Sequence, residues 1–131
     1  MKQIGELFQT ADWKAEKHVP VIEMLLKAKK GENIKMVVSV GKQIPHPNTT
    51  EHHIVWIDVQ FLPEGEKFPY HLGRYEFLAH GASTQGPNTS TIYTNPEITV
   101  NFKTEKSGTV YAYSYCNIHG LWSNSIELKL E

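Results

Sequence analysis

The chain has 131 residues, of which 40% are hydrophobic and 21% are charged, a balance typical of globular proteins. This length predicts a single domain, residues 1–131, that buries roughly two-thirds of the surface its unfolded chain exposes. The formal net charge of -1 gives no long-range attraction to nucleic acid or to an anionic membrane, so neither is an expected partner. No apolar run reaches the length of a membrane span, and residues 1–12 lack the apolar core of a secretory signal. The lone cysteine, Cys116, cannot form an intramolecular disulfide, and these features together predict a cytoplasmic protein.

Apolar residues recur along the chain mostly with a period of two, which indicates β-strands. In chain order, strands are predicted at 18–23, 34–40, 55–61, 74–80, 98–102, 110–116 and 126–130. Within 55–61, the alternation places Val55, Ile57, Val59 and Phe61 on the core face. The stretch 23–30 is compatible with a helix but short, and we expect a strand end or a loop there. Seven short strands separated by Gly-, Pro- and Asn-rich loops predict an all-β fold, an immunoglobulin-like seven-stranded antiparallel β-sandwich without the usual Cys–Trp–Cys core.

Three segments collect the side chains that can carry chemistry. They are 16–20, just ahead of the first predicted strand, the loop 41–53, and 115–122, at the end of the 110–116 strand. Each segment alone is compatible with a solvated turn. Together they hold the thiol and five of the seven histidines: Cys116, His18, His46, His52, His53 and His119.

The third segment places an imidazole three residues after the thiol. Across a tight turn, Cys116 and His119 are able to reach the same metal ion, and the backbone N–H groups of Ile118 and His119 are expected to point at the sulfur. Such bonds stabilise a thiolate and tune the electron density that it donates. The alternative is a buried structural cysteine with a surface histidine nearby, because Cys116 falls on the apolar phase of its strand.

The second segment fixes one histidine and leaves two others undecided. His46 stands between two prolines, which restrict its backbone to extended conformations and pre-orient its side chain. The alternative for this motif is an ordinary proline-rich turn. His52 and His53 point to opposite faces if both continue the strand, and the alternation of 55–61 puts His53 on the core phase. Periodicity does not decide which of the two binds a metal, and at most one is expected to.

Four imidazole nitrogens and one sulfur suit iron, copper or zinc. Five protein ligands exceed the four of a structural zinc site, and an octahedral ion would keep one position open for substrate. One rival is a cupredoxin-like electron-transfer protein, but its weak axial methionine would follow the histidine closely, where Leu121 and Trp122 stand here. A second rival is a non-enzymatic metal-binding module, which would need a closed coordination sphere.

These motifs closely resemble those of the one-iron superoxide reductases, also called neelaredoxins. The resemblance covers essentially the whole chain, and no functional position departs from the family pattern. The extra four-cysteine iron domain of some relatives is lacking, so one catalytic iron is implied. The matching segments are Glu-Lys-His-Val-Pro at 16–20, Pro-His-Pro-Asn-Thr-Thr-Glu-His-His at 45–53, Cys-Asn-Ile-His-Gly-Leu-Trp at 116–122, and shorter matches at 13–14, 77–81 and 86–89.

The resemblance implies a role for each residue of the set. His18, His46 and His52 would be equatorial iron ligands through Nε, His119 the fourth through Nδ, and Cys116 the axial ligand. Glu16 would occupy the open position in the resting ferric state and leave it on reduction, and Lys17 would lie beside it. His53, His71 and His80 receive no role, and the last two are expected to be surface or hydrogen-bonded polar residues.

The implied activity is the one-electron reduction of superoxide to hydrogen peroxide without oxygen release, as a defence against oxidative stress. The implied cofactor is one Fe2+/Fe3+ per chain. A rubredoxin is the implied electron donor, and a dimer or tetramer of identical chains the implied assembly.

Overall fold

The structure, a computed structural model, describes residues 1–25 and 27–131. The described residues form seven β-strands and a single-turn 3-10 helix, η1 (Ile4–Leu7), with no α-helix among them. No helix in the described ranges is long and apolar enough to cross a membrane. The strands are β1 (Pro20–Met24), β2 (Ile34–Val40), β3 (Ile54–Pro63), β4 (Tyr70–Glu76), β5 (Glu97–Phe102), β6 (Gly108–Cys116) and β7 (Gly120–Leu128).

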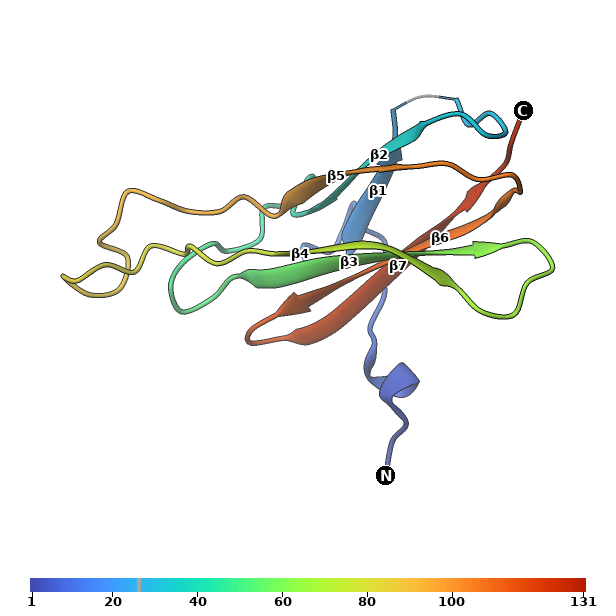
Figure 1. The fold of residues 1–131 in the computed structure, drawn as a ribbon. Helices are drawn as coiled ribbons and strands as arrows, with labels where there is room; N and C mark the ends of the chain where they lie inside the picture. The colour runs from blue at the N-terminus through green and yellow to red at the C-terminus, as the bar shows by residue number, and fades with distance from the viewer. Residues whose placement is uncertain (26) are drawn as a thin grey trace.

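The strands pack as two antiparallel sheets, of order β1-β2-β5 and β4-β3-β6-β7 (Figure 1). The core lies between the sheets and is built largely from the alternating apolar positions of the strands. Its fully buried members include Ile34, Met36, Val38, Ile57, Val59 and Val110. The predicted all-β sandwich of seven antiparallel strands is confirmed.

Two predicted strands are displaced along the chain. The strand predicted at 74–80 is β4, which ends at Glu76, and the strand predicted at 126–130 is β7, which begins at Gly120. β4 is an edge strand without a fully buried residue, and in β7 only Trp122 and Leu128 are buried, so neither shows a clear alternation. The stretch 23–30 contains the end of β1 and then loop, as expected, although Leu26 lies outside the described residues.

A β-bulge at the start of β3 corrects the predicted core face. Ile54 pairs with Cys116 and Trp56 pairs with Tyr115, so that Val55 is an extra residue. Ile54 is therefore buried, whereas Val55 is only half-buried. Because a bulge reverses the phase of alternation, counting back from Ile54 places His52 on the inward side.

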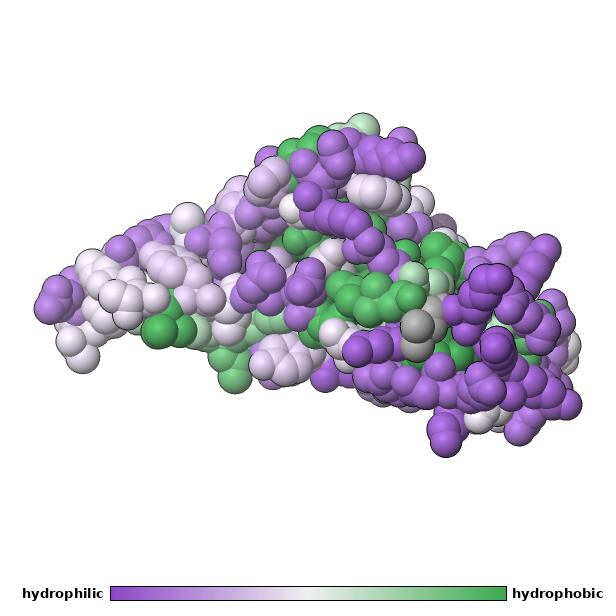
Figure 2. Space-filling view, turned by 90° about the horizontal axis from the view of Figure 1, so that it is seen from above, coloured by the Kyte–Doolittle hydropathy of each residue, from purple (hydrophilic) through white to green (hydrophobic). Residues whose placement is uncertain are grey.

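The segment before β1 and three connections, β2–β3, β4–β5 and β6–β7, meet at one end of the sandwich. Three strand pairs fix this arrangement, Pro20 with Val40, Ile54 with Cys116 and Trp56 with Glu76. The connection between β4 and β5, residues 77–96, projects from this end as a long arm (Figure 1, yellow to orange). Seen from the side of the three-stranded sheet, the arm carries mostly residues of intermediate hydropathy, whereas hydrophilic residues gather at the opposite end (Figure 2).

Candidate metal centre

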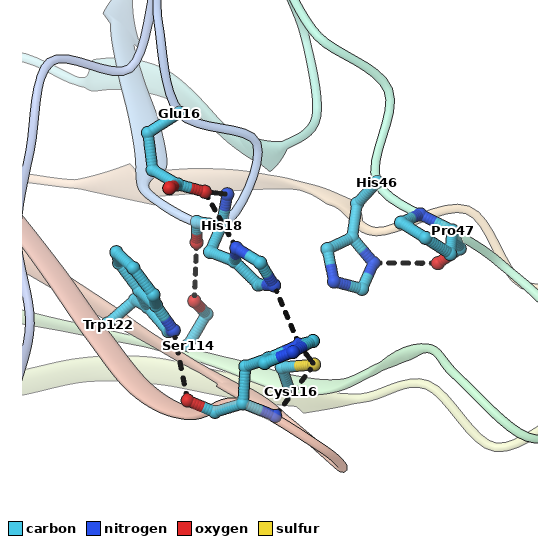
Figure 3. Close-up of polar contacts among 8 residues, drawn as sticks. Glu16, His18, His46, Pro47, Ser114, Cys116 and Trp122 are labelled. Atoms are coloured by element: carbon cyan, nitrogen blue, oxygen red, sulfur yellow. Dashed lines mark hydrogen bonds and ion pairs between the residues drawn. The ribbon is translucent and has the colours of Figure 1, made fainter.

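The fold brings the three chemistry-bearing segments together. The 16–20 segment runs into β1, the 41–53 loop joins β2 to β3, and the turn after Cys116 joins β6 to β7. The pairing of Ile54 with Cys116 sets the end of the loop against the turn. Their side chains converge on one point between the segments (Figure 3).

Four metal-ligating side chains gather closely there. One donor atom each from His18, His52, Cys116 and His119 lies within 4.8 Å of the others. His18 Nε2 is 3.2 Å from His119 Nδ1, which is 3.8 Å from Cys116 Sγ. The ring of His46 lies just outside this group, with its centroid 4.8 Å from those of both His18 and His52. The structure thus unites all five nitrogen and sulfur candidates.

In His18 and His46 a hydrogen bond holds Nδ1, so that Nε2 is directed toward this point. His18 Nδ1 lies 2.6 Å from Glu16 Oε1, and His46 Nδ1 lies 2.6 Å from the carbonyl oxygen of Pro47. The Nε2 atoms of His46 and His52 are buried and have no hydrogen-bond partner among the residues that the structure describes. A buried polar atom without a partner costs about 1–3 kcal/mol, a penalty that a metal bond would remove. The donor set present therefore fits a metal ion held by imidazole and thiolate.

Burial favours the neutral form of His46 and His52, the form that binds metals, by lowering the pKa of each imidazole. It lowers the pKa of His46 to about 4, although the bond to Pro47 opposes the shift. Burial also lowers the pKa of His52, with further contributions from the charges of His119 and His18. For Glu16, desolvation acts to raise the pKa, but hydrogen bonds from the side chain and backbone of His18 prevail, and the pKa lies below its ordinary value.

The thiol of Cys116 is enclosed by its own turn. The residue is buried, and the backbone N–H of His119 donates to Sγ at 3.3 Å. Of the two donors expected from the sequence, only this one reaches the sulfur in the described chain; the N–H of Ile118 does not. A single N–H donor still stabilises negative charge on the sulfur.

Glu16 and Lys17 lie at the open side of the centre. An open cleft of about 320 Å³ reaches His18 and the exposed His119 from solvent. The carboxylate of Glu16 accepts hydrogen bonds from the backbone N–H of His18 at 2.9 Å and from its Nδ1, so in this position it orients an imidazole. The cleft is lined by Ala15, Glu16, Lys17, His18, Ile44 and His119.

The remaining histidines are hydrogen-bonded outside the donor group. His71 Nε2 lies 3.0 Å from Asp58 Oδ2, and His80 bonds to the carbonyl oxygen of Phe77 at 2.6 Å, as expected for satisfied polar residues. His53 turns away from the centre and stacks on His80, with ring centroids 3.5 Å apart.

Sequence reasoning missed the contacts that support the donors. Trp122 stacks on His18, and Asn117 bonds to the backbone on both sides of His52. Both residues stand inside the 116–122 motif, and that position is the one signal that could have drawn attention to them.

Comparisons with known proteins agree with this site. The sequence profile of the desulfoferrodoxin family matches residues 10–125. The chain is 58% identical to the superoxide reductase of Pyrococcus furiosus over 126 residues, which cover 96% of this chain and 99% of that protein. It is 50% identical to the neelaredoxin of Megalodesulfovibrio gigas, with coverage of 96% and 97%. The solved structure of the superoxide reductase (neelaredoxin) from Archaeoglobus fulgidus in the reduced form superposes with a TM-score of 0.89 at 64% identity, covering 95% of this chain and 99% of that one. On this evidence the chain belongs to the desulfoferrodoxin and neelaredoxin family.

Proposed function

We propose that this chain is a superoxide reductase that uses one iron ion held by His18, His46, His52, His119 and Cys116. The observation that carries the proposal is the convergence of four imidazoles and a thiol. Two of the imidazole nitrogens are buried and have no hydrogen-bond partner in the described part of the chain. The chain also matches superoxide reductases over nearly the whole length of those proteins.

The reaction adds one electron and two protons to superoxide and releases hydrogen peroxide. Iron in this donor set, when bound, supplies the electron, and a thiolate ligand favours its transfer. The chain's own groups do the rest. The N–H of His119 holds negative charge on Sγ, and the carboxylate of Glu16 fixes the tautomer of His18 that leaves Nε2 free for the metal. The open cleft admits the anion and the water that provides protons.

Lys17 is proposed to attract the substrate. Its position on the cleft beside His18 places an ammonium group at the entrance. A unit charge at ~5 Å and an effective dielectric constant of ~20 attracts superoxide by about 3 kcal/mol. With a net charge of only -1, this local attraction dominates the approach.

Glu16 is proposed to alternate between two partners. In the position observed it bonds to His18, and when ferric iron is bound its carboxylate would leave His18 and be a sixth ligand of the ion. The hydrogen bonds to His18 lower the pKa of this carboxyl group and so stabilise its ionised form, which is the form that a metal binds.

Four further points of the proposal come from the sequence and the family resemblance. The chain would act as one domain, 1–131, in the cytoplasm, in keeping with its single cysteine. A rubredoxin would deliver the electrons, and identical chains would form a dimer or tetramer. Reduction by rubredoxin in stopped flow, and the mass measured by light scattering, test the last two.

The central experiment is anaerobic purification, metal analysis and reaction of the reduced protein with superoxide. One iron per chain, with peroxide formed and no oxygen released, supports the proposal. Oxygen released in dismutation stoichiometry would keep the site but change the activity. Bound copper, or no reaction with superoxide, would favour cupredoxin-like electron transfer and overturn the proposal.

A further inference from the structure

We propose that Asn117 is a positioning residue of the metal centre, which fixes the loop carrying His52 to the turn carrying Cys116. Asn117 directly follows the cysteine in sequence but contributes no atom to the donor group. The inference rests on the proposed function in one respect, that His52 and Cys116 both bind the metal.

Three hydrogen bonds join Asn117 to the two neighbours of His52. The side-chain Nδ2 donates to the carbonyl oxygen of Glu51 at 2.9 Å, and Oδ1 accepts from the backbone N–H of His53 at 2.9 Å. The backbone N–H of Asn117 donates to the carbonyl oxygen of His53 at 3.2 Å. The side-chain amide of Asn117 therefore bonds to the residue before His52 and to the residue after it, which are 66 and 64 residues away in sequence.

Thr49 holds the backbone of His52 itself. Its backbone N–H donates to the carbonyl oxygen of His52 at 2.9 Å, and its Oγ1 accepts from the N–H of His52 at 3.1 Å. Loops on a protein surface usually leave such groups to water. The bonds between Thr49 and His52 lie within one loop and do not reach the turn that carries Cys116. Of the hydrogen bonds described here, those of Asn117 are the ones that join the two segments.

This placement matters because, within residues 1–25 and 27–131, no hydrogen bond anchors the imidazole of His52. Its Nε2 is buried and has no hydrogen-bond partner in the described chain, so the backbone and packing set the direction of the ring. Metal–ligand distances tolerate only about 0.2 Å, less than the ordinary motion of an untied loop. A tie between two ligand-bearing segments therefore bears directly on how well they bind one ion.

Asparagine meets the chemical demand of this position. The carbonyl of Glu51 needs a donor and the N–H of His53 needs an acceptor, and a side-chain amide supplies both. A carboxylate supplies no donor, and an aliphatic side chain supplies neither. Glutamine carries the same groups, but its extra methylene moves them away from the positions that bond to Glu51 and His53.

The test compares metal binding by four proteins: the wild type, Asn117→Ala, Asn117→Gln and the control Asn33→Ala. Asn33 also makes a side-chain hydrogen bond, to Asn101, but it precedes β2 at the end remote from the 41–53 loop. Each metal-free protein is titrated anaerobically with Co²⁺ against a competing chelator, and the visible bands of the cobalt form are recorded. We expect Asn117→Ala to bind Co²⁺ about 10- to 100-fold more weakly with shifted bands, the range typical of a ligand's hydrogen-bond partner, and Asn33→Ala to match the wild type.

A second readout needs no metal. In the metal-free protein, the N–H of His53 should exchange with deuterium faster in Asn117→Ala than in the wild type or in Asn33→Ala. Wild-type affinity and wild-type cobalt bands in Asn117→Ala overturn the inference while the proposed function stands. Should Asn117→Ala fail to fold, Asn117→Gln carries the test, and wild-type affinity and bands there overturn it equally. A wild type that binds no Co²⁺ overturns the metal site and this inference together.

Discussion

The indole of Trp122 stacks on the imidazole of His18, with ring centroids 4.8 Å apart and planes 14° from parallel. The same indole donates from Nε1 to the carbonyl oxygen of His119 at 3.2 Å. One largely buried side chain on β7 therefore supports two proposed ligands that come from distant parts of the chain.

Replacing this tryptophan should affect stability in two steps. Trp122→Phe keeps an aromatic face for His18 but loses the bond to His119, and we expect the free energy of unfolding of the metal-free protein to fall by about 1 kcal/mol. Trp122→Ala also loses the buried ring, and we expect a fall of about 3–5 kcal/mol. Urea denaturation measures both. The control Trp13→Phe, outside the core, should change stability by less than about 0.5 kcal/mol. Equal stability of all three variants would contradict the supporting role.

The lowered pKa of His46 predicts a pH dependence of the metal-free protein. The imidazole has an ordinary pKa of 6.5 and a pKa of about 4 in the fold, so the folded state disfavours its protonation. Stability from this group is complete above about pH 6.5 and declines as the pH falls toward 4, because the unfolded chain takes up the proton first. In His46→Gln, we expect proton uptake on unfolding near pH 5 to decrease by about one proton. Urea midpoints between pH 7 and 4.5 measure this, and an unchanged slope would refute it.

Removing the ammonium group of Lys17 should slow the approach of superoxide. Lys17→Ala is expected to lower the second-order rate constant of the reduced enzyme about tenfold and to weaken its dependence on salt. The bound iron should remain, because Lys17 provides no ligand. Lys42→Ala is the matched control, since Lys42 lies in the 41–53 loop and pairs with Glu23 away from the cleft. Pulse radiolysis gives the rate constants. An unchanged rate constant in Lys17→Ala would exclude the attraction.

The projecting arm should stabilise the histidine-bearing loop through Asn88. Asn88 has a positive φ of 56°. Its side chain accepts a hydrogen bond from the N–H of Thr50 at 2.9 Å and donates one to the carboxylate of Glu51. The bond to Glu51 lowers the pKa of that carboxyl group. Asn88→Gly keeps the backbone conformation accessible but loses these bonds, so the N–H of Thr50 should exchange faster and the pKa of Glu51 should rise. Asn88→Ala adds the strain of positive φ and should be less stable than Asn88→Gly by about 1 kcal/mol. NMR follows the exchange and the carboxyl titration. If Thr50 exchanges at the wild-type rate in both variants, the arm does not support the loop.

The sequence predicts the sandwich because period-two alternation is strong wherever a strand faces the core, as in β2. It misplaces β4 and β7, where exposed edges and polar positions remove the alternation. The donor set was predicted from residue types, spacing and family resemblance. Periodicity alone did not decide whether His52 or His53 belongs to it. The bulge at Val55 changes the phase between the strand and the loop, and no local sequence signal marks it. The role proposed for Asn117 was equally inaccessible, because its hydrogen bonds span 64 residues or more.

His18 and His119 meet across 101 residues of chain. During synthesis at about 5–20 residues per second, the first of these histidines leaves the ribosome about 5–20 s before the second. Once His52 has also emerged, and until Cys116 follows, the nascent chain carries His18, His46 and His52 but not the thiol. The full donor group gathers only when the pairing of β3 with β6 has brought Cys116 to the loop. All five donors are therefore available to one ion only after β6 has been synthesised and paired with β3.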